Sequence, residues 1–124
     1  MNQLTNVYKL LSDETRLRMV VLLYQQDLCV CELSGILDAP QPRISKNLAK
    51  LRDLNLVIDK RKEKFVFYSL GTENVILTQS IKNIIETLAL YPQLVTDQAR
   101  LADKEKYIHD CSINPGFSTI NKAT

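Results

Sequence analysis

The sequence predicts a mostly α-helical domain with one small β-hairpin, an α+β fold. Apolar residues recur at helical spacing between residues 3 and 54, Pro40 and Pro42 interrupt that pattern, and residues 57–70 are rich in β-branched and aromatic side chains. With 124 residues and 45% hydrophobic content, the chain has the size and composition of one globular domain. Because so short a chain buries proportionately little surface, we expect a dimer.

The first part of the chain is predicted to form three helices. Helical spacing of apolar residues predicts them over residues 3–11, 13–26 and about 30–38. Ser12 or Asp13 can cap the second helix. The side chains predicted to face the core are Leu4, Val7, Leu10, Leu11, Leu17, Val20, Val21, Tyr24, Val30, Leu33 and Leu37.

A fourth helix and a β-hairpin follow the two prolines. The segment QPRISKNLAKLRDLN has a proline suited to a first helical turn. Residues 57–62 and 64–70 read as two strands, and Thr72 can cap a long helix over residues 72–91. The side chains of the fourth helix predicted to be buried are Ile44, Leu48, Leu51 and Leu54.

The C-terminal part has weaker signals. Pro92 ends or kinks the long helix, a further helix is predicted from about 96 to 109, and residues 112–124, with Asn-Pro-Gly, are predicted to be loose. We therefore expect a winged helix-turn-helix unit for DNA binding and dimerisation over residues 1–91, followed by a partly helical extension over residues 92–124.

Positive charge is concentrated in the fourth helix and the hairpin. Residues 41–64 hold eight basic and three acidic residues, a net charge of +5, whereas the whole chain carries only +2. A helix, a turn, a second helix and a basic hairpin in this order indicate a winged helix-turn-helix that binds double-stranded DNA. The alternative is a solvated basic face. The expected DNA contacts, mostly to phosphate, are Gln41, Arg43, Ser45, Lys46, Asn47, Lys50, Arg61, Lys62 and Lys64.

Two cysteines, Cys29 and Cys31, stand at the start of the third helix. The chain has three cysteines, and an odd number argues against a disulfide framework. Thiolates bind soft ions, but residues i and i+2 of an α-helix point about 200° apart, so one ion can take both only where the backbone is not helical. The alternative is that both are small buried hydrophobes, although other residues already fill the inward stripe of this helix.

Four segments together resemble the ArsR/SmtB family of winged-helix repressors: LSDETRLRMVVLL, LCVCEL, QPRISKNLAKLRDLNLV and FVFYSL. They follow family order over about residues 4–90, and the arsenic-responsive branch is the most similar. The resemblance implies a homodimer joined by the helices at 3–11 and 72–91. It also implies a repressor of an arsenic-resistance-type operon, released from its operator when As(III) or Sb(III) binds cysteine thiolates.

The chain departs from that branch in its third sulfur. The family usually has a cysteine three residues after the second, where this chain has Ser34. Cys111 can supply the missing sulfur from the C-terminal segment, although an incidental cysteine is the alternative. The expected metal ligands are therefore Cys29, Cys31 and Cys111, with As(III) or Sb(III) as the inducer and no organic cofactor. The single histidine, His109, is expected to lie on the surface rather than in a metal site.

Two further departures concern the hairpin and the fifth helix. The tip of the hairpin usually has glycine where this chain has Glu63, so a turn with positive φ would be strained. Residues 72–91 contain no histidine, which argues against the zinc site that some family members carry there.

The sequence also excludes several functional classes. No apolar run reaches the length of a membrane span, and the N-terminus lacks signal-peptide organisation, so we expect a cytoplasmic protein without membrane partners. An enzyme is not expected, since there is no Cys-X-X-Cys after a strand, no Ser-His-Asp set and no phosphate-binding glycine loop. Two alternatives stay open: a repressor that senses persulfide or oxidant through a Cys–Cys bond, and a winged helix used only for protein contacts.

Overall fold

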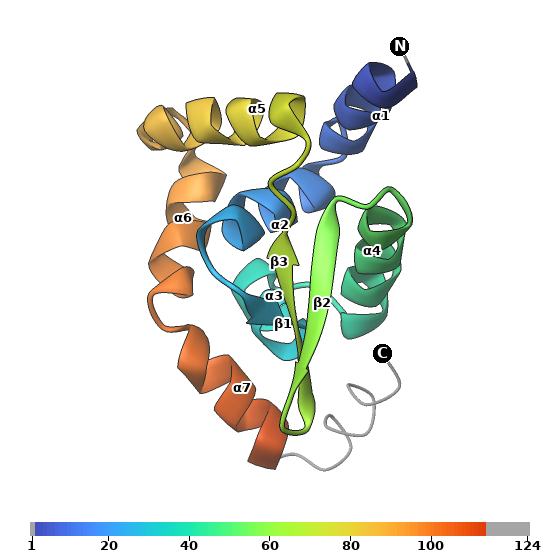
Figure 1. Ribbon diagram of the computed structural model, residues 1–124. Coiled ribbons are helices and arrows are strands. Elements are labelled where there is room, and N and C mark those ends of the chain that lie inside the picture. Colours follow the sequence, from blue (N-terminus) through green and yellow to red (C-terminus); the bar gives the residue numbers. More distant parts are fainter. Residues whose placement is uncertain (1, 114–124) are drawn as a thin grey trace.

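The computed structural model describes residues 2–113, and the surroundings of side chains as far as residue 108. Helices surround a small sheet, and the β2–β3 hairpin projects from it as a wing (Figure 1). The α+β winged-helix prediction is confirmed. In chain order the elements are α1 (Asn2–Leu11), α2 (Glu14–Gln25), β1 (Leu28–Cys29), α3 (Val30–Leu37), α4 (Gln41–Asp53), β2 (Val57–Lys62), β3 (Phe65–Leu70), α5 (Val75–Glu86), the 3-10 helix η1 (Leu88–Leu90), α6 (Pro92–Leu101) and α7 (Lys104–Ile113).

The sheet is antiparallel, with the order β1-β3-β2. The sequence predicts β2 and β3 but only an extended link where β1 forms. Cys29 of β1 lies opposite Phe67 of β3, so the first cysteine is tied to the base of the wing. At the wing tip, Glu63 has a φ of 59°, the left-handed conformation for which a glycine is better suited.

The core is built around α2 and the inner faces of α3, α4 and α5. Ile44, Leu48 and Leu51 of α4 are buried as predicted. Leu54 was predicted to be buried and is 38% exposed, because α4 ends at Asp53 and Leu54 is already its C-cap. Tyr24, predicted to face inward from α2, is also 38% exposed.

The C-terminal helices differ from the prediction in their boundaries. α5 begins at Val75 and not at Thr72, because the Asn74 side chain accepts a hydrogen bond from the Leu77 N–H at 3.0 Å. Pro92 begins α6, and the single helix predicted over 96–109 is divided between α6 and α7. α7 continues to residue 113, so the beginning of the segment predicted to be loose is helical; residues 114–124 lie outside the described part.

α6 and α7 turn back along the domain, so that α7 packs against α3 (Figure 1). The guanidinium of Arg18 in α2 holds the carboxylate of Asp97 in α6 through two hydrogen bonds of 2.9 Å. Arg100 of α6 donates to the carbonyl oxygen of Ile36 at 3.1 Å. Through residue 113, no helix has the length and apolar character needed to cross a bilayer.

Candidate DNA-binding surface and cysteine site

The basic residues lie on two neighbouring elements. α4 packs against β2, and Figure 1 shows the helix beside the wing. An ion pair of 3.4 Å between Arg52 and Asp59 joins them, but both side chains are about half exposed, so the pair contributes little to stability. The predicted DNA contacts that are exposed are Arg43, Lys46, Lys50, Arg61, Lys62 and Lys64. This arrangement suits a helix in the major groove with a wing against the phosphate backbone.

Three predicted DNA contacts have different surroundings. Gln41 is only 3% exposed and its amide points to α3, so in this structure its side chain is turned inward, and its contact with DNA stays a prediction. Ser45 is half-buried, and its hydroxyl oxygen is fully buried without a hydrogen-bond partner in the described part of the chain. Asn47 accepts a hydrogen bond from Arg16 of α2 at 3.3 Å, which ties its side chain to the protein. The first turns of α4 are therefore engaged with the domain as well as with solvent.

Cys29 and Cys31 lie in a small apolar cluster separate from the main core. Each is 1% exposed, and Phe65, Phe67 and Ile108 pack around them. Both cysteines are off the inward stripe of α3, as the spacing indicated, yet they are buried because the base of the wing and α7 cover them. The C-terminal extension therefore forms part of the cysteine site, a contact that the sequence pattern does not show.

Cys29 lies just outside α3, as its N-cap, with φ −94° and ψ 172°. Its backbone N–H donates to Oε1 of Glu32 at 3.1 Å in a capping box. Because Cys29 is extended and Cys31 helical, the opposed directions of i and i+2 in a regular helix do not apply to this pair. Cys29 is a free cysteine, whereas Cys31 is disulfide-bonded in the structure.

Burial shifts the pKa of two groups at this site, the Cys29 thiol and the Glu32 carboxyl group. It raises the pKa of the Cys29 thiol to about 12, so the free cysteine is protonated at neutral pH. Burial also raises the pKa of Glu32, which is 2% exposed. A soft ion that binds Cys29 must therefore displace a proton from the sulfur.

An open cavity of about 820 Å³ adjoins the cysteine cluster. Phe65, Phe67 and Ile108 line its apolar part and also contact the cysteines. Charged side chains of the wing and α7 form its rim, and Glu32 lines it as well. This cavity brings solvent up to the side chains that cover the two cysteines.

Cys111 belongs to α7, three residues after Ile108. The side chains of Cys111 and His109 lie outside the described residues, so the predictions for both are untested. As far as side chains are described, no three His, Cys, Asp or Glu residues are grouped so that they could hold a metal ion.

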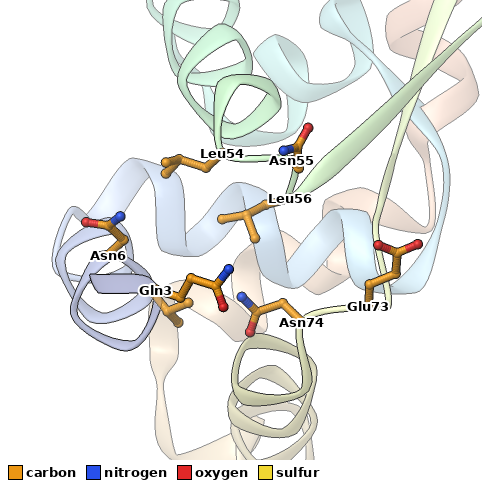
Figure 2. A pocket seen from close by; sticks show the side chains of 8 residues that line it. Gln3, Asn6, Leu54, Asn55, Leu56, Glu73 and Asn74 are labelled. Atoms are coloured by element: carbon orange, nitrogen blue, oxygen red, sulfur yellow. The ribbon is translucent and has the colours of Figure 1, made fainter. Parts of the chain in front are cut away.

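A second hollow, of about 350 Å³, lies between α1, the α4–β2 turn and the start of α5 (Figure 2). Figure 2 shows the side-chain amides of Gln3, Asn6, Asn55 and Asn74 around it. Among the described residues that line it there is no cysteine or histidine, the donors that suit a soft ion.

Comparisons with known proteins place the chain in a family. The family model described as "Bacterial regulatory protein, arsR family" matches residues 13–59. The chain is 32% identical to the "Cadmium resistance transcriptional regulatory protein CadC homolog" of Staphylococcus aureus over 72% of this chain and 69% of that protein. The chain belongs to the arsR family of bacterial regulatory proteins. Since these are DNA-binding transcriptional regulators, the prediction that the protein is not an enzyme is confirmed.

Two further similarities refine this placement. The chain is 46% identical over 68 residues to the "Arsenic resistance transcriptional regulator ArsR1" of Pseudomonas putida, a match covering 54% of this chain and 53% of that protein. The chain thus spans about half the length of this arsenic-resistance relative. Its fold is similar to "Reduced HlyU from Vibrio cholerae N16961", with a TM-score of 0.64 and 29% identity over 73% of this chain and 90% of that one.

Proposed function

We propose that this arsR-family protein is the repressor of an arsenic-resistance-type operon and leaves its operator when As(III) or Sb(III) binds cysteine sulfur. The observation that carries the proposal is the return of α7 onto the cysteine pair, where Ile108 packs with Cys29 and Cys31. The arsenic-resistance name of a 46% identical relative supports the choice of ligand.

The proposed ligands are Cys29, Cys31 and Cys111. Residues three apart in an α-helix lie on the same face, so helical spacing assigns Cys111 to the face of α7 that carries Ile108. This spacing offers a third sulfur to replace the cysteine that is absent at Ser34. Soft sulfur donors suit a trivalent arsenic or antimony centre, which supplies strong bonds to sulfur when bound. Because the first two cysteines are almost fully buried, α7 or the wing must move to admit the ion.

The DNA-binding form is proposed to be a homodimer. α1, α5 and η1 form one end of the molecule in Figure 1 and carry the exposed apolar side chains Tyr8 (58%), Val75 (73%) and Leu90 (71%). A partner that covers these residues would place two α4 helices on successive major grooves, about 34 Å apart, over an inverted repeat. Sedimentation should show a dimer at micromolar concentration, and Val75→Glu should shift it toward monomer; a monomeric parent protein would contradict this part of the proposal.

Release requires that the ion bind more tightly to the state with low DNA affinity. Cys29 and Cys31 stand at the start of α3, and α3 packs against α4. A change at these sulfurs therefore acts next to the helix that is proposed to contact DNA.

The test is operator binding, measured by fluorescence anisotropy on the DNA upstream of the gene, with reduced protein. Arsenite or antimonite should lower the affinity of the parent protein, and Cys29→Ser should remain bound at the same arsenite concentration. The proposal is wrong if neither ion changes the affinity of the parent protein.

A second candidate function is supported by the disulfide at Cys31. A repressor of the same fold can respond to oxidant or persulfide when the state of this sulfur changes. Peroxide or a persulfide donor would then release the operator while arsenite has no effect, and addition of a dithiol reductant would restore binding.

A further inference from the structure

Gln41 is the first residue of α4, yet its side chain belongs to the protein interior. It is 3% exposed, and its Nε2 donates a hydrogen bond to the sulfur of Cys31, 3.5 Å away. A side chain of the proposed DNA-binding helix therefore contacts one of the proposed inducer ligands directly. The two residues are ten positions apart in the sequence and belong to different helices.

The carbonyl oxygen of the same side-chain amide has no hydrogen-bond partner among the described residues. Oε1 of Gln41 is buried and accepts no hydrogen bond within the described part of the chain. The hydroxyl of Ser45 is in the same situation one turn further along α4. Residues i and i+4 are neighbours on a helix, so α4 presents two unsatisfied polar groups on one face. Buried polar atoms without partners raise the free energy of the conformation that contains them.

We propose that Gln41 is a positioning residue that transmits the state of the Cys31 sulfur to α4. The inference rests on the proposed function, because it concerns the response of the same site. A reduced Cys31 carries an S–H proton, and the amide oxygen of Gln41 can accept it. A sulfur bonded to an ion or to another sulfur has no proton, and this is the state of Cys31 in the structure, where Oε1 has no partner among the described residues.

The proton balance of the arsenite reaction fits this role. Arsenous acid, As(OH)3, exchanges each hydroxide for a cysteine sulfur: the S–H bond breaks, an As–S bond forms, and the proton leaves with the hydroxide as water. No electron is transferred. The reaction at Cys31 thus removes the S–H donor that the oxygen of the Gln41 amide can use in the reduced protein. As in the structure, Nε2 can still donate to the sulfur, but Oε1 is left buried without a partner among the described residues, which raises the free energy of this placement of the first turn of α4.

The experiment compares Gln41→Met, which keeps the length of the side chain but removes the amide, with the parent protein. Gln98→Met is the matched control, since that amide also forms hydrogen bonds, with Gln25, away from the cysteines. Operator affinity is measured by anisotropy for each protein in the reduced, arsenite-loaded and oxidised states. The readout is the ratio of affinities between states, which a uniform change in folding or DNA contact would leave unaltered.

For the parent protein and for Gln98→Met, we expect the ratio to be at least about fivefold in one of the two modified states, within the usual range of allosteric coupling. For Gln41→Met we expect it to fall below about twofold. A Gln41→Met protein that responds like the parent overturns the role of Gln41, and so does a parent protein that responds to neither modification. A parent protein that responds to oxidation but not to arsenite, with a Gln41→Met variant that responds to neither, supports this role and removes the arsenic function.

A measurement on the parent protein covers the case in which the variant does not fold. The side-chain amide resonances of Gln41 in a 1H–15N spectrum should move when arsenite is added to the reduced protein, because the hydrogen bond of that amide changes. The amide resonances of Gln98 should stay in place. Unchanged Gln41 resonances in arsenite-loaded protein would overturn the proposal.

Discussion

Arg18 of α2 and Asp97 of α6 form a two-pronged ion pair, with Nε and Nη2 each 2.9 Å from a carboxylate oxygen. The carboxylate is 2% exposed and also accepts a hydrogen bond from Gln93 at 3.1 Å. The hydrogen bonds that the Arg18 guanidinium donates to this carboxylate raise the pKa of Arg18. This pair joins α6, at the start of the C-terminal extension, to α2 of the winged-helix unit.

Asp97→Ala should destabilise the protein by about 3 kcal/mol, because it leaves the charge of a largely buried arginine without a partner. Since the pair also joins α6, the helix before α7, to α2, the variant should bind arsenite more weakly. Urea unfolding and arsenite titration measure the two effects. Glu86→Ala, at an exposed position of α5, is the control and should be neutral in both. A variant as stable as the parent would show that the extension is held by other contacts.

Gly35 of α3 is a point of close approach by α7. A Cβ at this position would overlap the ring of Tyr107 and lie 2.8 Å from its Cβ, so α7 itself would have to shift. We expect Gly35→Ala to lower stability by about 1–3 kcal/mol through overpacking and to weaken arsenite binding. Gly71→Ala is the control, because its nearest neighbour would be 3.5 Å away. Equal stability and arsenite affinity in the two variants would contradict the proposed role of α7.

If the basic residues of α4 and the wing contact phosphates, operator affinity should fall as the salt concentration rises. Lys46→Ala in α4 and Arg61→Ala in the wing should weaken binding and reduce the slope of log K against log salt by about 0.9 for each phosphate that the variant no longer neutralises. Lys82→Ala is the control, since this exposed lysine is on α5. Slopes that are the same in all three variants would mean that the basic face is only a solvated surface.

Because Cys29 is buried, we expect its rate of alkylation to depend on pH differently from that of an exposed cysteine. Its pKa rises from an ordinary 9.0 to about 12, so below pH 9 the native thiol has roughly 1000-fold less thiolate than the unfolded chain. Alkylation of Cys29 in reduced native protein, followed by mass spectrometry, should continue to accelerate above pH 9, whereas in urea it should level off there. The stability that the neutral thiol contributes is complete below pH 9 and is lost between pH 9 and 12. A native profile that levels off near pH 9 would refute this burial effect.

The winged-helix unit could be predicted from the sequence because its signals are local. Helical spacing, the two prolines at the start of α4 and the β-formers of β3 each act within one element, and Ile44, Leu48 and Leu51 are buried as predicted. β1 was missed because a two-residue strand has no periodicity. Such local patterns say little about contacts between distant segments.

The surroundings of the candidate site depend on such distant contacts. Gln41 is predicted to contact DNA because it stands at the start of a basic helix, but its burial depends on α3. Tyr107 packs at Gly35, far from it in the sequence, and no local sequence pattern predicts this contact. The polar pair of Arg18 and Asp97 was missed for the same reason.

The most direct test of the proposed arsenic site is X-ray absorption at the arsenic edge of the arsenite-loaded, reduced protein, which counts the sulfur ligands. We expect three sulfurs in the parent protein and in the control His109→Ala, and two in Cys111→Ser. A coordination shell of oxygen, or three sulfurs retained in Cys111→Ser, would contradict a site made of Cys29, Cys31 and Cys111.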